Sequence, residues 1–211
     1  MKPKAIFFDI DGTILPFDGV IRKLQEACKH FNVRIITKKE ILRYTIGYKI
    51  EESIPRVIPE TKKFINEFAD YYRNIYNKDV KSIKPFSYVK EVFKFVKKNK
   101  IMIGIVTTKS RIQAEVTLKY YKLPYDTIVG GDDVKKTKPD PEPVLKACGN
   151  LKVNPKDCIF VGDHPFDMLA AKSAGCLPVG TLTGWGNRKN LKIAGAKYIL
   201  KDLRGLKKII E

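Results

Sequence analysis

Short apolar runs alternate with amphipathic stretches from Ser87 to the end of the chain. The apolar runs predict buried strands at 101–106, 127–129, 158–161, 177–180 and 198–200. The amphipathic stretches predict helices near 89–96, 111–121, 142–149, 166–174 and 188–194, followed by a closing helix. Strands that alternate with helices in this way favour a doubly wound parallel sheet with helices on both faces, so the sequence predicts an α/β fold.

A further apolar run, Ala5-Ile6-Phe7-Phe8, lies near the start of the chain and predicts a buried parallel strand. Asp9 and Asp11 come directly after it, at the strand edge where open α/β sheets bind ligands. Because side chains alternate along an extended chain, the two carboxylates could converge on one cation or one reacting group. Gly12 then permits a tight turn, and Thr13 can cap the next helix.

A helical segment separates this first strand from the alternating part of the chain. From Val20 to about Asp79 apolar residues recur at helical spacing, without a strand pattern between them. Breaks that contain proline lie on both sides of this segment, near Pro16–Gly19 and Ser82–Pro85, and we expect hinges at both places.

The length of 211 residues allows a core with a small inserted domain. We expect a Rossmann-like α/β core domain formed by residues 1–16 and 84–211, and an all-helical cap domain formed by residues 17–83. Closure of this cap would exclude water from the strand edge.

Nothing in the sequence resembles a membrane span or a secretory signal. No apolar run approaches the ~20 residues of a transmembrane helix, and Asp9 interrupts the short apolar run near the start. The four cysteines lack the short paired spacing of a zinc site, which favours buried free thiols in a reducing compartment. We therefore expect a cytoplasmic protein without a membrane partner, either a monomer or a homodimer.

The formal net charge of +18 raises the question of nucleic-acid binding. The lysines are spread along the whole chain, however, and no basic and aromatic stripe marks a single groove, so we expect no nucleic-acid partner. Abundant Lys, Glu and Ile with few glutamines is also typical of hyperthermophile proteins, which offers another cause for the charge.

Polar residues come after two more of the predicted strands. Thr107-Thr108-Lys109-Ser110 lies after the strand at 101–106, where hydroxyls and helix amides could meet an anion or simply cap the next helix. Asp163 and Asp167 lie after the strand at 158–161, which suits one acid at the strand tip and one on the first helical turn. His164, between them, has no Ser or Cys partner in the pattern and is expected to be structural or exposed.

A loop rich in Gly and Pro extends from Gly130 to Pro143 and contains Lys138. Pro139 and Pro141 reduce the freedom of this loop, and an ammonium held there could neutralise phosphate charge.

Taken together and in this order, these motifs resemble those of the haloacid dehalogenase superfamily. The Asp-x-Asp-Gly-Thr signature at Asp9–Thr13, Thr107, Lys138 and the Gly-Asp-x-x-x-Asp motif at 162–167 match the four motifs of that family across nearly the entire chain. The resemblance implies magnesium-dependent phosphoryl transfer. The presence of Asp11 argues against a dehalogenase, since the resembling dehalogenases lack an acid at this position.

The resemblance also implies a role for each motif residue. Asp9 would attack phosphorus to form an aspartyl phosphate, and Asp11 would act as acid and then as base. Thr107 and Lys138 would hold the phosphoryl oxygens. The expected Mg²⁺ ligands are Asp9, Asp163, Asp167, directly or through water, and the backbone carbonyl of Asp11. The expected substrate-binding residues are Thr13, Thr108, Gly47, Tyr48 and Lys49.

The cap loop Gly47-Tyr48-Lys49 lies where related enzymes select their substrates. Lys49 could reach an anionic group, or it could be an exposed lysine beside a glycine that ends a helix. The sequence around Lys138 is similar to that of phosphoglycolate phosphatases and their pyrophosphatase relatives. The first expectation for the substrate is therefore a small phosphomonoester such as phosphoglycolate.

Several alternatives remain open from the sequence. A phosphosugar mutase or a pyrophosphatase would share the same motifs, and a phosphonate-cleaving enzyme could use Lys38, Lys39 or Lys49. From a different class, the chain could be a non-catalytic or nucleic-acid-binding protein on this fold.

Overall fold

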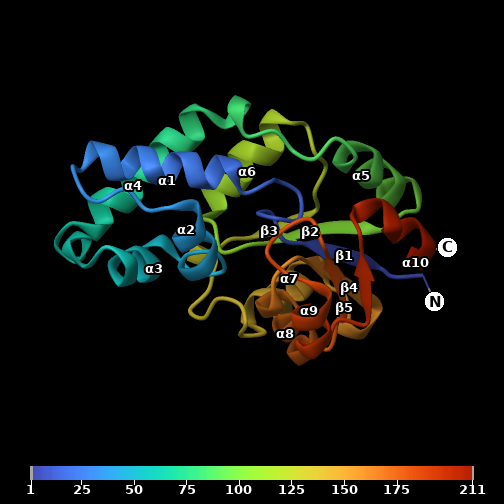
Figure 1. Ribbon diagram of the computed structural model, residues 1–211. Coiled ribbons are helices and arrows are strands. Elements are labelled where there is room, and N and C mark those ends of the chain that lie inside the picture. Colours follow the sequence, from blue (N-terminus) through green and yellow to red (C-terminus); the bar gives the residue numbers. More distant parts are fainter. Residues whose placement is uncertain (1, 211) are drawn as a thin grey trace. The chain divides into compact units, whose positions relative to one another are not determined.

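The predicted strands form one parallel six-stranded sheet in the computed structural model, which describes residues 2–210. The strands are β1 (Ala5–Phe8), β2 (Met102–Val106), β3 (Thr127–Val129), β4 (Cys158–Gly162), β5 (Leu177–Thr181) and β6 (Tyr198–Leu200). Their order across the sheet is β3-β2-β1-β4-β5-β6. The predicted doubly wound α/β core is therefore confirmed (Figure 1).

Strand β1 lies in the middle of the sheet, between β2 and β4. Phe7 of β1 is in register with Gly104 on one side and with Phe160 on the other. The chain adds strands outward from β1 to β3 on one side and from β4 to β6 on the other, so the order reverses beside β1. In open α/β sheets the ligand crevice lies outside the carboxyl ends of the strands at such a reversal.

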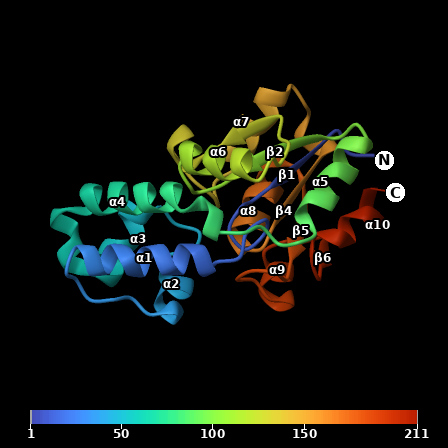
Figure 2. The same cartoon turned by 90° about the horizontal axis from the view of Figure 1, so that it is seen from above.

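Helices cover both faces of this sheet. They are α5 (Val89–Lys98), α6 (Arg111–Tyr120), α7 (Glu142–Leu151), α8 (Pro165–Ala174), α9 (Arg188–Ile193) and α10 (Lys207–Ile210), with short 3₁₀ turns at Gly131–Asp133, Pro155–Asp157 and Leu203–Leu206. Phe7 joins a core cluster with Val144 of α7 and Ala170 of α8. Phe8, which points to the opposite face, packs its ring 4.9 Å from that of Phe93 in α5. Figure 2 shows the same sheet from above.

The segment after β1 is helical, as predicted, and forms a second compact unit of residues 17–84. Its helices are α1 (Asp18–His30), α2 (Lys38–Tyr44), α3 (Ile50–Val57) and α4 (Ile65–Lys78), with 3₁₀ turns at Pro59–Lys63 and Val80–Ser82. Helices α1 and α4 pack together, and the ring of Phe31 lies 5.3 Å from that of Phe64. Thr37 and Glu40 form a capping box at the start of α2.

The other unit contains residues 1–16 and 85–211. The N–H of Phe86 donates to the carbonyl of Ile14 at 3.1 Å, which ties the returning chain to the end of the first core segment.

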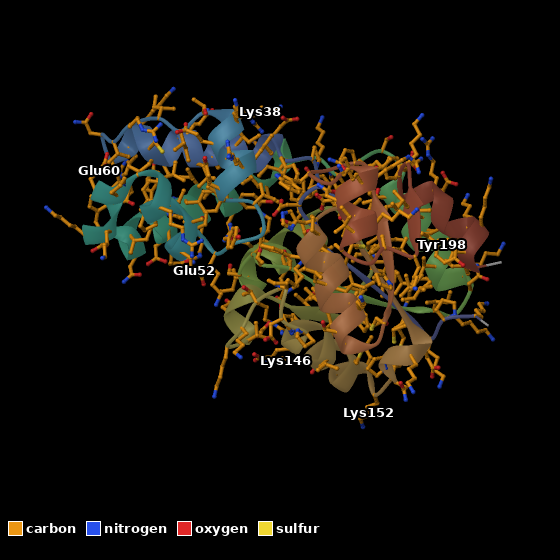
Figure 3. The ribbon with its side chains drawn as sticks, turned by 60° about the horizontal axis from the view of Figure 1, so that its bottom comes forward. Lys38, Glu52, Glu60, Lys146, Lys152 and Tyr198 are labelled. Carbon is orange, nitrogen blue, oxygen red and sulfur yellow. The ribbon has the colours of Figure 1, made fainter. Side chains whose placement is uncertain are left out.

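All four cysteines are buried and unpaired, as the sequence predicts. Cys148, Cys158 and Cys176 share one core cluster, although they come from α7, from β4 and from the residues that precede β5. Within residues 2–210 no helix is long and apolar enough to cross a membrane. Lys146 and Lys152 project from the surface at α7 and just beyond its end (Figure 3), which fits the dispersed pattern of charge.

Two glycines of the core unit give a matched test of this packing. A Cβ on Gly104 would lie 2.3 Å from a ring carbon of Phe7, whereas a Cβ on the exposed Gly149 in α7 would meet nothing within 4 Å. We expect Gly149→Ala to raise the free energy of unfolding by about 0.5–1 kcal/mol, because alanine favours the helix and restricts the unfolded chain. We expect Gly104→Ala to lower it by about 1–3 kcal/mol through overpacking. Urea unfolding measures both, and an unchanged stability for Gly104→Ala would contradict this packing.

Candidate active site

Three of the predicted carboxylates meet at the carboxyl edge of the sheet. Asp9 directly follows β1, Asp163 directly follows β4, and Asp167 lies in the first turn of α8. Each offers a carboxylate oxygen, and these atoms lie within 4.8 Å of one another. All three residues are buried. Their closeness results from the topology, because β1 and β4 are neighbours at the reversal of strand order.

Lys138 is buried among these carboxylates. Its Nζ lies 2.8 Å from Oδ1 of Asp9 and 2.7 Å from Oδ1 of Asp167. It also donates a hydrogen bond of 3.2 Å to the carbonyl of Val106, at the end of β2. One ammonium therefore links the ends of β1 and β2 and the start of α8.

The loop that carries Lys138 is held by backbone hydrogen bonds. The N–H groups of Lys135 and Lys136 donate to the two carboxylate oxygens of Glu142, each at 2.9 Å. Because Glu142 begins α7, the loop is fixed to a helix that packs on β2 and β3. Lys135 and Lys136 themselves are exposed.

Asp163 is held by hydrogen bonds from two other segments. The hydroxyl of Thr13 donates to Oδ1 at 3.1 Å, and the backbone N–H of Trp185 donates to Oδ2 at 2.7 Å. A Cβ on Gly184 would lie 2.0 Å from Oδ2, so only glycine fits beside this carboxylate. The sequence did not lead us to expect Gly184 and Trp185 in the site. The sequence signal that could have indicated them is the glycine-containing segment directly after the predicted strand at 177–180.

The turn after β1 differs from the prediction in one respect. Thr13 does not cap the next helix, because α1 begins only at Asp18 and its N-terminus has no side-chain cap. Thr13 is fully buried and its hydroxyl binds Asp163 instead. Gly12 has a φ of +86°, and a Cβ there would lie 2.3 Å from Asp163, so both its conformation and its surroundings require glycine.

Asp11 does not join the three carboxylates. The carbonyl of Ile10 accepts the backbone N–H groups of Thr13, Ile14 and Leu15, so the chain turns after Asp9 and leaves the extended geometry from which we expected convergence. Oδ2 of Asp11 lies 3.1 Å from Nζ of Lys109. Oδ1 is buried and has no hydrogen-bond partner among the described residues. The carboxylate of Asp11 is therefore not part of the metal cluster, and a role for its backbone carbonyl stays a prediction.

The residues of the polar cluster after β2, 107–110, make different contacts. Ser110 caps α6, because its side chain accepts the N–H of Gln113. Thr107 is buried, and its hydroxyl oxygen accepts the N–H of Lys109 at 3.2 Å, which leaves the hydroxyl proton to be donated elsewhere. Thr108 is half-buried in the same loop. Ser110 thus supplies the helix cap, and Thr107 directly follows β2, two residues before Lys109.

His164 has the structural role that we expected. Its Nδ1 accepts the N–H of Phe166 and thereby caps α8, while Asp167 accepts the backbone N–H of His164 at 2.9 Å. Its ring packs 4.7 Å from that of Trp185. Burial, together with the nearby Lys138 ammonium, lowers the pKa of His164 to about 4, so the ring is neutral near pH 7.

The charges of the site do not balance. Burial raises the pKa of Asp9, and burial followed by repulsion from Asp167 raises that of Asp163 well above its ordinary value. Burial alone would lower the pKa of Lys138, but Asp167 and Asp9 outweigh it and raise that pKa. When all three acids are ionised, three carboxylates face one ammonium, which leaves two negative charges in excess. Carboxylate oxygens with this excess suit a hard divalent cation.

Gly47, Tyr48 and Lys49 lie together between α2 and α3 of the helical unit. Gly47 has a φ of +86°, and Lys49 is the N-cap residue of α3. The guanidinium of Arg56 lies over the ring of Tyr48 at 5.2 Å. The role of this loop in substrate selection stays a prediction.

Comparisons with known proteins agree with the motifs. Residues 6–180 match the family model of haloacid dehalogenase-like hydrolases. A relative from Caldanaerobacter subterraneus subsp. tengcongensis, provisionally named pyrophosphatase PpaX, is 32% identical over 220 residues, which cover 100% of this chain and 96% of the relative.

Solved structures show the same fold. A crystal structure from Bacteroides fragilis, provisionally named a haloacid dehalogenase-like hydrolase, has a TM-score of 0.86 and 27% identity and covers 97% of this chain and 100% of its own. A predicted phosphoglycolate phosphatase from Haemophilus somnus has a TM-score of 0.85 and 22% identity over 100% and 99% of the two chains, which supports the fold alone. The resemblance seen in the sequence is confirmed: the chain belongs to the haloacid dehalogenase-like hydrolases.

Proposed function

We propose that the chain is a magnesium-dependent phosphatase that hydrolyses a small phosphorylated compound through an aspartyl-phosphate intermediate. The observation that carries this proposal is the buried contact of Lys138 with Asp9, beside Asp163 and Asp167, at the reversal of strand order. A family of hydrolases and a site with an excess of carboxylates both favour phosphoryl transfer assisted by a cation.

Each residue then has a chemical task. A carboxylate oxygen of Asp9 forms a bond to phosphorus while the bond from phosphorus to the leaving oxygen breaks. Asp11 gives its proton to the leaving oxygen and later takes one from the water that hydrolyses the acyl phosphate. Its unpartnered Oδ1 suits this exchange, because no described hydrogen bond competes for it. Lys138 and Thr107 stabilise the charge on the transferring oxygens.

Asp9, Asp163 and Asp167 would hold the magnesium ion, with the backbone carbonyl of Asp11 as a further ligand. The fit rests on the cluster of buried oxygens and on its two excess negative charges. When bound, a hard cation supplies neutralisation of the carboxylates and of the phosphoryl oxygens that approach them.

For the substrate, phosphoglycolate remains the first candidate and pyrophosphate the second. The names of several relatives, pyrophosphatase PpaX, support pyrophosphate as a candidate substrate. We propose that Thr108 in the core loop and Gly47, Tyr48 and Lys49 in the helical unit contribute to substrate binding. Thr13, whose hydroxyl binds Asp163, would support the metal site.

Phosphate release from a panel of compounds tests the proposed function. With magnesium, we expect turnover of phosphoglycolate or pyrophosphate, and little or none with EDTA. Asp9→Asn removes the nucleophile and should abolish turnover while the fold, measured by circular dichroism, is kept. Equal activity of Asp9→Asn and the parent protein would exclude the aspartyl-phosphate route.

Lys138→Ala tests electrostatic stabilisation within the site. We expect kcat to fall by about 10² or more, as for the loss of one donor that stabilises transition-state charge. Lys135→Ala is the matched control, because this lysine is exposed in the same loop; its kcat should match that of the parent. Both proteins are assayed at saturating magnesium, and an unchanged kcat for Lys138→Ala would remove Lys138 from the site.

The pKa shifts predict how magnesium binding depends on pH. Asp9 and Asp163 have raised pKa values in the folded protein without metal. Their contribution to stability is therefore present below the unfolded pKa and is lost as the pH rises through the folded pKa. A cation binds the deprotonated carboxylates and should replace this lost stability.

We therefore expect a fixed magnesium concentration, about 100 times the Kd at pH 8, to raise Tm by about 5 °C or more near pH 8 and by less near pH 5.5, where protons compete for the carboxylates. Differential scanning calorimetry at the two pH values measures this difference. Asp163→Asn should reduce the gain at both. A gain that is larger at the lower pH would contradict the proposed ligands.

A further inference from the structure

A second buried lysine lies in the site, on the side of Asp11. Lys109 comes after β2, and its backbone N–H donates to the hydroxyl oxygen of Thr107. Its side chain is only 6% exposed, and Nζ lies 3.1 Å from Oδ2 of Asp11. Lys138, by contrast, contacts Asp9 and Asp167. The two ammonium groups thus contact different carboxylates at the same edge of the sheet.

We infer that Lys109 binds negative charge on the leaving group, so that the site prefers substrates whose leaving group is itself an anion. This inference rests on the proposed function, in which Asp11 protonates the leaving oxygen. Phosphorylated hydroxycarboxylates and pyrophosphate belong to this class. Phosphate esters of uncharged alcohols do not.

The geometry of Asp11 places Lys109 beside the leaving group. The two oxygens of one carboxylate have different surroundings: Oδ1 has no described hydrogen-bond partner, while Oδ2 contacts the ammonium. A leaving oxygen that contacts Oδ1 of Asp11 is therefore separated from Nζ of Lys109 only by the carboxylate group of Asp11. A second anionic group one or two bonds beyond the leaving oxygen comes within reach of that ammonium, where both charges are shielded from water.

Lys109 is nearly fully buried in the loop between β2 and α6. Removing an ammonium from water is costly, and the attraction of a carboxylate often only offsets that cost. An anionic group that arrives with the substrate would give this ammonium a charge-assisted contact that forms only in the complex.

The test compares two substrates that differ in one group. Phosphoglycolate and 2-hydroxyethyl phosphate share the same ester linkage, but only the first has a carboxylate in its leaving group. We measure the ratio of kcat/KM for the first to that for the second, with magnesium. Lys109→Met should lower this ratio by about 10- to 100-fold, the effect of losing one charge-assisted contact.

Three variants separate this role from others. Lys109→Arg keeps the charge and should retain more of the ratio than Lys109→Met. Lys90→Met removes an exposed lysine of α5 and should leave the ratio unchanged. Lys49→Met tests the helical unit as the source of the preference. The inference is overturned if Lys109→Met lowers both kcat/KM values equally, since Lys109 then only positions Asp11, or if Lys49→Met alone lowers the ratio.

A binding experiment separates this inference from the proposed function. In the Asp9→Asn background, isothermal titration calorimetry with magnesium gives the Kd of both compounds without turnover. We expect phosphoglycolate to bind more tightly than 2-hydroxyethyl phosphate, and Lys109→Met to remove most of that difference. If the parent protein turns over neither compound, the proposed substrates fail, but a preference in binding that depends on Lys109 still supports this inference. Equal binding of both compounds with Lys109 present overturns it.

Discussion

The burial of an ammonium between two carboxylates is the interaction on which the site depends. Lys138 reaches Asp9, Asp167 and the carbonyl of Val106 from a loop that is distant in sequence. Without it, three carboxylates would share a buried space without the ammonium that contacts Asp9 and Asp167, a state that costs far more than a single ion pair returns. The sheet topology brings the acids together, and Lys138 makes their closeness tolerable even before a cation is added.

The surrounding backbone is built to fit this charge. Glycine at positions 12, 162 and 184 lets the chain approach the carboxylates of Asp163 and Asp167 at distances that a Cβ would forbid. That approach excludes water, and the N–H of Trp185 and the hydroxyl of Thr13 take its place around Asp163. Burial then raises the pKa values of Asp9 and Asp163, so protons would compete with the proposed cation for these carboxylates. The packing around the acids would thus link the proposed metal binding to pH.

The fold and most of the site could be predicted because they depend on local patterns. Short apolar runs at 101–106 and 158–161 favour buried strands, and polar residues that follow parallel strands meet at one edge of the sheet. In the structure Asp9, Thr107 and Asp163 directly follow β1, β2 and β4. Alternation of side chains did not anticipate that the carboxylate of Asp11 lies outside the cluster of Asp9, Asp163 and Asp167, because the period of two holds only while the chain is extended, and the turn centred on the carbonyl of Ile10 ends that geometry.

Lys109 and Trp185 were missed for a different reason. Their contacts depend on which loops become neighbours, and strand order decides this: β5 lies beside β4, so the segment after β5 reaches Asp163, and β2 lies beside β1, so Lys109 reaches Asp11. A sequence with many lysines gives no sign that one of them is buried. The strand order explains why the two acids of the Asp-x-Asp signature contact the ammonium groups of two different lysines. Asp9 contacts Lys138 and Asp11 contacts Lys109, and this separation suits the different roles that we propose for two carboxylates two residues apart.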